Sequence, residues 1–168
     1  MALPAALQNL SLPVIGSPMF IASGPALVAA QCKAGIVGSF PALNARPAEL
    51  LDTWLTDLKK ELSDYQGANP GLRIGPIAVN QIVHQSNDRL AHDVEMCVKH
   101  QVPIIISSLR APPPEMLDAI QEALEPLGLA LVLLTLDSDS FPLSVVAEEQ
   151  AEEVRRLAQE LGFTLTVY

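Results

Sequence analysis

Pro76-Ile-Ala-Val-Asn-Gln-Ile-Val-His84 is the stretch around which the chain is organised. Its apolar residues predict a buried strand, and polar Asn80 and Gln81 follow where that strand should end. Ser86 or Asn87, both good N-cap residues, then begins a helix. Because parallel α/β proteins bind ligands beyond the carboxyl ends of their strands, these two amides are candidate ligand contacts. An amide offers a donor and an acceptor, which suits the edge of a heteroaromatic ring; the alternative is that both amides only hold their own turn.

The composition indicates one globular α/β domain. With 168 residues the chain can bury a core, but it is shorter than the roughly 250 residues of a full (β/α)₈ barrel. The net charge of −9 argues against nucleic acid or an anionic membrane as a partner. No apolar run is long enough for a transmembrane helix, and Met1-Ala-Leu-Pro4 lacks a basic start, so we expect a cytoplasmic protein. Cys32 and Cys97 have no CxxC spacing and are interpreted as buried thiols in a reducing compartment.

Apolar runs alternate with segments of helical periodicity along the whole chain. This alternation predicts a (βα)₅β arrangement, in which all six strands form one parallel sheet with a helix after each of the first five. A helix is expected over 145–161, and a polar loop over 137–140 precedes it. The expected strands lie near 13–16, 36–40, 77–81, 103–108, 129–135 and 163–168.

Several blocks of the first 109 residues resemble the nitronate monooxygenase (2-nitropropane dioxygenase) family, and they appear in the order expected for it. The resemblance covers about two-thirds of the chain and ends at Leu109. Several blocks in the same order as in the family are stronger evidence of a resemblance than any single motif. The blocks are Pro13-Val-Ile-Gly-Ser-Pro-Met-Phe20, residues 31–47 with Phe40-Pro-Ala-Leu-Asn-Ala-Arg-Pro47, Ala78-Val-Asn-Gln-Ile-Val-His84, Ser86-Asn-Asp-Arg-Leu90 and residues 97–109.

The resemblance implies an FMN-dependent barrel enzyme that oxidises alkyl nitronates with molecular oxygen. In fold it implies a (β/α)₈ barrel, and the (βα)₅β arrangement expected from the alternation resembles the first part of such a TIM barrel, truncated or open. It places Pro18, Met19 and Asn80 against the flavin ring, with Gln81 and Ser108 as weaker companions. The chemistry of these residues agrees, because a thioether suits a ring face and an amide suits its polar edge.

The sequence after Leu109 departs from the family. It contains no histidine, and its only glycines, Gly128 and Gly162, stand at expected helix ends. Neither the family's catalytic histidine nor its glycine-rich phosphate loops can therefore be transferred, and no catalytic residue is assigned. We expect a single domain over 1–168, nitronate monooxygenase-like over 1–109 and divergent over 110–168, with weak or absent FMN binding.

The remaining candidate residues are weak. His92 and His100 would lie about 12 Å apart on one helix and cannot share a metal ion, so no metal is expected. His84 closes the central strand and is a candidate pocket residue. Asp137 and Asp139 have no basic neighbour and are interpreted as a solvated loop.

Three functions remain open on the sequence alone. The first is a flavin-dependent oxidoreductase acting on a small nitronate. The second is a non-catalytic barrel fragment, in which a second copy of the chain covers the open sheet edges. The third is a small doubly wound α/β protein that binds a small ligand. Bound flavin, seen as a yellow protein absorbing near about 450 nm, separates the first from the others.

Overall fold

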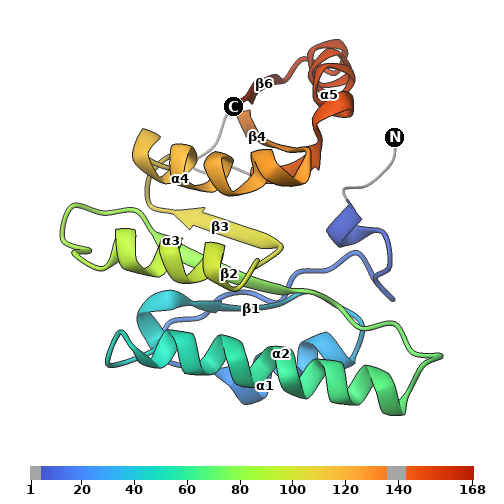
Figure 1. The fold of residues 1–168 in the computed structure, drawn as a ribbon, viewed down its shortest axis with the longest axis vertical. Helices are drawn as coiled ribbons and strands as arrows, with labels where there is room; N and C mark the ends of the chain where they lie inside the picture. The colour runs from blue at the N-terminus through green and yellow to red at the C-terminus, as the bar shows by residue number, and fades with distance from the viewer. Residues whose placement is uncertain (1–4, 136–142) are drawn as a thin grey trace.

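The central strands form a parallel sheet in the computed structural model, which describes residues 5–135 and 143–168 (Figure 1). The strands β1 (Gly38–Pro41), β2 (Ile77–Ile82) and β3 (Ile104–Ser108) lie in the order β1-β2-β3. The register aligns Asn80 with Pro41 on one side and with Ile106 on the other. The sequence-based prediction of a parallel arrangement is confirmed for these three strands.

Three helices pack on one face of the parallel sheet: one precedes β1 in the chain, and the other two connect β1 to β2 and β2 to β3. They are α1 (Pro25–Lys33), α2 (Leu50–Ala68) and α3 (Leu90–Lys99). Leucines at helical spacing give α2 one apolar face, which is the face it buries. The core on this side includes Phe40, Leu51, Leu55, Leu58, Val79 and Cys97.

The opposite face of the parallel sheet is covered by the amino-terminal segment, which includes the short 3₁₀ helix η1 (Ala5–Leu7). Leu10, Val37 and Ala78 are buried there, and Ile104 and Ile106 pack against them in half-buried positions. This apolar layer is thin, because a short irregular segment covers the strands where the other face has three helices.

The strand expected near 13–16 is reduced to a single parallel bridge between Ile15 and Val37. The prolines on either side explain its shortness, since Pro13 and Pro18 have no N–H to donate to a strand ladder. The N–H of Val14 is also withdrawn from pairing, because it donates locally to the carbonyl of Leu12 at 2.8 Å.

The carboxyl-terminal part forms a separate antiparallel sheet, so the expected all-parallel arrangement is wrong there. The strands β4 (Leu129–Thr135), β5 (Leu143–Ala147) and β6 (Thr164–Val167) lie in the order β5-β4-β6, and both pairings are antiparallel. The start of the helix expected over 145–161 belongs to β5, where β-branched Val145 and Val146 pair with β4. The helix α5 (Glu148–Glu160) begins at two glutamates, which favour a helix amino terminus.

Helices cover both faces of this second sheet. The helix α4 (Pro114–Leu124), followed by the 3₁₀ helix η3 (Glu125–Leu127), packs on the face that presents Leu131. Leu165 and Val132 face α5 instead, where they bury Ala158. The two units meet where β5 approaches β3 and where α4 packs against α3, and Figure 1 shows α4 above β3 and α3.

The protein therefore has a mixed α/β fold. The strands of the described residues form two separate sheets and no closed barrel, so the expected likeness to a TIM barrel is not confirmed. The loop expected over 137–140, with Asp137 and Asp139, lies outside the described residues. No helix within the described ranges has both the length and the apolar character needed to cross a membrane.

Candidate functional site

Asn80 and Ser108 lie side by side near the carboxyl ends of β2 and β3, with Asn80 two residues before the end of β2. Asn80 is 3% exposed, and its Nδ2 donates to the carbonyl oxygen of Ile106 at 3.0 Å and to Ser108 Oγ at 2.8 Å. Both N–H groups of the amide are thus used inside the protein. Asn80 Oδ1 remains as an acceptor for a ligand, and the Ser108 hydroxyl hydrogen remains as a donor.

Asn44 holds the loop that contains Pro18 and Met19 at the same end of the sheet. Asn44 belongs to the 3₁₀ helix η2 (Ala42–Asn44), which directly follows β1. Its Nδ2 donates to the carbonyl oxygens of Met19 at 3.0 Å and Ser23 at 2.8 Å, and its Oδ1 accepts from the Ile21 N–H at 3.0 Å. One amide therefore fixes three points of the loop relative to β1.

The tip of this loop presents apolar side chains to solvent. Met19 is 45% exposed, Phe20 55% and Ile21 82%, whereas Pro18 is half-buried. Ile21 also has a left-handed backbone with φ 67°, which a β-branched residue rarely adopts. Consecutive exposed apolar residues beside a polar strand end are typical of a surface that binds a ligand or a partner.

Gln81 does not join this group, because successive side chains of a strand point to opposite faces of the sheet. It is fully buried beneath α3, where its Nε2 donates to Cys97 Sγ at 3.3 Å. Burial raises the pKa of the Cys97 thiol to about 12, so this thiol stays protonated at neutral pH. The structure thus brings Asn80 and Ser108 together, holds the loop at Met19 to the same end of the sheet through Asn44, and directs Gln81 to the other side of the sheet.

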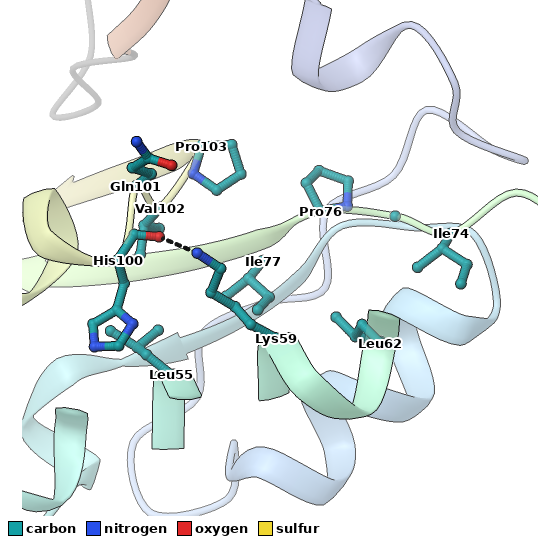
Figure 2. Close-up of a pocket in the computed structure, with 11 residues that line it drawn as sticks. Leu55, Lys59, Leu62, Ile74, Pro76, Ile77, His100, Gln101, Val102 and Pro103 are labelled. Atoms are coloured by element: carbon teal, nitrogen blue, oxygen red, sulfur yellow. Dashed lines mark hydrogen bonds between the residues drawn. The ribbon is translucent and has the colours of Figure 1, made fainter. Parts of the chain in front are cut away.

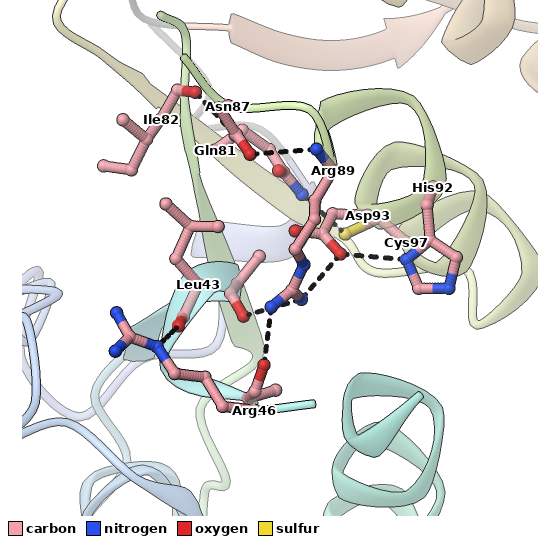
Figure 3. Close-up of polar contacts among 11 residues, drawn as sticks. Leu43, Arg46, Gln81, Ile82, Asn87, Arg89, His92, Asp93 and Cys97 are labelled. Carbon is pink, nitrogen blue, oxygen red and sulfur yellow. Dashed lines mark hydrogen bonds and ion pairs between the residues drawn. The ribbon is translucent and has the colours of Figure 1, made fainter. Parts of the chain in front are cut away.

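A buried ion pair joins the start of α3 to the loop after β1 (Figure 3). Arg89 Nη2 lies 2.9 Å from Asp93 Oδ1, and Asp93 is fully buried. The same guanidinium donates to the carbonyl oxygens of Ala45 at 2.7 Å and of Ala42 at 3.4 Å. Arg89 therefore clamps the loop that carries Asn44, and through Asn44 it supports the loop at Met19.

Three buried polar atoms at this junction have no hydrogen-bond partner among the described residues: Gln81 Oε1, Arg89 Nε and Asp93 Oδ2. Figure 3 shows these three side chains turned toward one another where β2 meets α3. Buried polar atoms of this kind destabilise a fold by about 1–3 kcal/mol each. The clamp is therefore stabilised by the hydrogen bonds that Arg89 does make, to Asp93 and to the carbonyl oxygens of Ala42 and Ala45.

The three histidines have separate partners. His84 Nδ1 accepts the Ser86 N–H at 3.2 Å and lies 2.7 Å from Ser86 Oγ, which places the hydrogen of the neutral ring on Nε2. His92 contacts Asp93, and His100 contacts Asp52 on α2. Among the described residues, no three metal-ligating side chains gather at one point.

A cavity of about 210 Å³ lies at the opposite end of the parallel sheet (Figure 2). It opens where β2 and β3 begin, beside Pro76 and Pro103, and Lys59 Nζ crosses it to the carbonyl oxygen of His100 at 2.9 Å. Its other walls include the apolar side chains of Leu55 and Ile77. Because parallel α/β sheets bind ligands at the carboxyl ends of their strands, this cavity is not the candidate site.

Comparison with family models gives one match, to a family described as "Domain of unknown function (DUF6630)", over residues 106–168. The matched segment begins within β3 and contains the entire antiparallel sheet with α4 and α5. Pro18, Met19 and Asn80 lie before the match, and Ser108 lies inside it. Comparison with curated proteins finds no match, and comparison with solved structures finds none.

The sequence predicts Asn80 and Ser108 as candidate site residues, and the structure places them in contact, but Asn44 and the Arg89–Asp93 clamp are not predicted from it. A weak signal for the clamp exists, since Arg89 and Asp93 have the i,i+4 spacing of a helical ion pair. Nothing in the sequence indicates that Arg89 reaches two carbonyl groups more than forty residues away.

Proposed function

We propose that the carboxyl edge of the parallel sheet binds the isoalloxazine ring of FMN, in an oxidoreductase resembling nitronate monooxygenase. The observation that supports the proposal best is the pair formed by Asn80 Oδ1 and the Ser108 hydroxyl. Together they offer one acceptor and one donor near the strand ends, and the exposed thioether of Met19 belongs to the loop that Asn44 holds at the same end of the sheet.

The ring fits these residues chemically. The pyrimidine part of a flavin has an N–H group flanked by carbonyl oxygens, so Asn80 Oδ1 would accept from the N–H and Ser108 would donate to a carbonyl. Met19 and Phe20 would cover a ring face with polarizable or aromatic surface. Bound FMN would supply the capacity to take electrons from a substrate, which the resemblance suggests is a small alkyl nitronate oxidised with oxygen.

The test is a fluorescence-quenching titration with FMN. We expect weak binding by the wild-type protein, and Asn80→Ala should lower the affinity about ten- to hundredfold, because a buried amide acceptor at the ring edge is lost. Asn69→Ala is the matched control, since Asn69 caps α2 away from the site and its Nδ2 donates to the carbonyl of Tyr65. A wild-type protein that does not quench FMN refutes the proposal.

Oxygen uptake with a nitronate then tests turnover separately. We expect slow turnover even when FMN is bound, because the sequence after His100 has no histidine to act as the family's base. Brisk oxygen consumption would show that another residue supplies this base.

A second candidate function is assembly without catalysis, in which a copy of the chain covers the outer edge of the parallel sheet. The observation in its favour is the segment beside β1, where Leu12, Val14 and Ile15 are all at least 46% exposed. Within the described residues this segment makes a single bridge to its neighbour, so a second copy would cover its exposed apolar side chains by packing on them. Sedimentation analysis across a concentration series measures the assembly, and a monomer at every concentration excludes it.

A further inference from the structure

Arg46 presents a free guanidinium beside the candidate ring site. Its Nε donates to the carbonyl oxygen of Leu43 at 3.0 Å, and its Cζ lies 5.0 Å from the centre of the Phe20 ring. Neither Nη atom has an acceptor among the described residues. Figure 3 shows the guanidinium turned away from the Arg89 clamp. The head group is therefore anchored by one nitrogen and one ring contact while its two outer nitrogens face solvent.

Arg46 has no carboxylate partner among the described residues, although the chain has a net charge of −9; Lys59, Arg73 and Arg110 share this lack of a carboxylate partner. Most of the other basic residues are neutralised by acidic neighbours. A guanidinium held in place with two free N–H edges matches the geometry of a phosphate group, which it can bind in a bidentate manner. The paired basic residues are Lys33, Lys60, Arg89, Lys99, Arg155 and Arg156.

Arg46 is also joined to the ring site through the loops. Phe20, on which it stacks, directly follows Met19, and Arg46 itself lies two residues after Asn44. Since Asn44 binds the backbone of the loop at Met19, the ring contact and the cation belong to one hydrogen-bonded unit. A ligand with an apolar ring and an anionic group on a flexible chain would place its ring against the loop and its anionic group against Arg46.

We infer that Arg46 binds the terminal phosphate of the flavin, so that the site takes FMN in preference to riboflavin. This inference rests on the proposed function, and it assigns a phosphate contact in a chain that lacks a glycine-rich phosphate loop.

Parallel titrations with FMN and with riboflavin test the inference, because the two ligands differ only in the phosphate. The wild-type protein should bind FMN about ten- to hundredfold more tightly than riboflavin, as expected for a charge-assisted pair of hydrogen bonds. Arg46→Gln should remove this preference and leave riboflavin affinity unchanged. Added salt should weaken FMN binding to the wild type more than to Arg46→Gln.

Arg73→Gln is the matched control, since Arg73 is an exposed arginine before β2 whose Nη1 donates to the carbonyl of Leu10 at 3.2 Å. It should behave as the wild type with both flavins. Equal wild-type affinities for FMN and riboflavin would overturn the phosphate contact and leave ring binding intact. An equal loss of both ligands in Arg46→Gln would also overturn it, by showing that Arg46 only supports Phe20. If neither flavin binds, the proposed function itself fails.

Discussion

Replacing Asp93 by asparagine should destabilise the protein far more than the same change at a surface ion pair. Asp93 Oδ1 accepts hydrogen bonds from Arg89 at 2.9 Å and lies 3.0 Å from His92 Nδ1, and the side chain is fully buried. Asp93→Asn keeps the shape of the side chain and removes its charge. The guanidinium of Arg89 would then lie in the interior without its anion.

The structure sets the expected magnitude. Removing one partner of a buried ion pair costs about 3–5 kcal/mol, because the remaining charge stays buried without compensation. The side chain of Arg89 is 19% exposed and keeps its hydrogen bond to the Ala45 carbonyl, so we expect the lower end, about 3 kcal/mol. With a urea dependence of about 2 kcal/mol per molar for a domain of this size, the unfolding midpoint should fall by about 1.5 M.

Urea titrations followed by circular dichroism measure this shift, and Asp64→Asn is the matched control. Asp64 pairs with Lys60 at the same i,i+4 spacing on α2, but the two side chains are 66% and 74% exposed. We expect its midpoint to match the wild type, since solvent screens an exposed pair. If the two variants shift by equal amounts, burial of the Arg89–Asp93 pair is not what makes it stabilising, and the reasoning fails.

Three further predictions concern stability and reactivity. Hydrogen bonding to Lys99 lowers the pKa of Asp52 below its ordinary 3.8, so its contribution to stability is present above about pH 4 and is lost as the pH falls through the lowered value; Asp52→Asn should therefore flatten the acid limb of a plot of stability against pH. Burial raises the pKa of Cys32 to about 11 and that of Cys97 to about 12, so Ellman's reagent should titrate both thiols in urea and neither in the native protein. Trp54→Ala should cost about 3 kcal/mol in a reversible urea titration, because the half-buried indole packs on the core of α2, and a loss below about 1 kcal/mol would contradict that packing.

The parallel strands could be predicted because their sequences allow few alternatives. Residues 104–106 form an unbroken apolar run after Pro103, and residues 77–79 do the same after Pro76, which is typical of strands buried on both faces. The antiparallel part was misread because the strand–helix rhythm was extended to the end of the chain. Phe163-Thr-Leu-Thr-Val-Tyr168 alternates apolar and polar residues, and this pattern is typical of a strand with one exposed face. The structure agrees, since Leu165 is buried between exposed Thr164 and Thr166.

The candidate site was predictable only where a residue's position follows from its strand. Asn80 lies two residues before the end of β2, and Ser108 ends β3 opposite Ile82, so the parallel register places the two side chains diagonally across from each other. Asn44 and Arg89 act through backbone carbonyl groups of residues distant in the sequence, and any residue could supply such an acceptor. Contacts of this kind depend on loop geometry, and no pattern of residue types in the sequence predicts them.

The position of β3 limits where two genes could recombine without separating Ser108 from Asn80. A crossover at Ile106, where the match to the domain of unknown function begins, would exchange half of β3 and with it Ser108, the neighbour of Asn80. A junction within Pro112-Pro113-Pro114 would instead leave the parallel sheet whole and transfer α4 with the antiparallel sheet. An exchange of segments between genes would therefore preserve the Asn80–Ser108 pair only if the breakpoint falls after β3 ends, downstream of Ile106, where the sequence similarity starts.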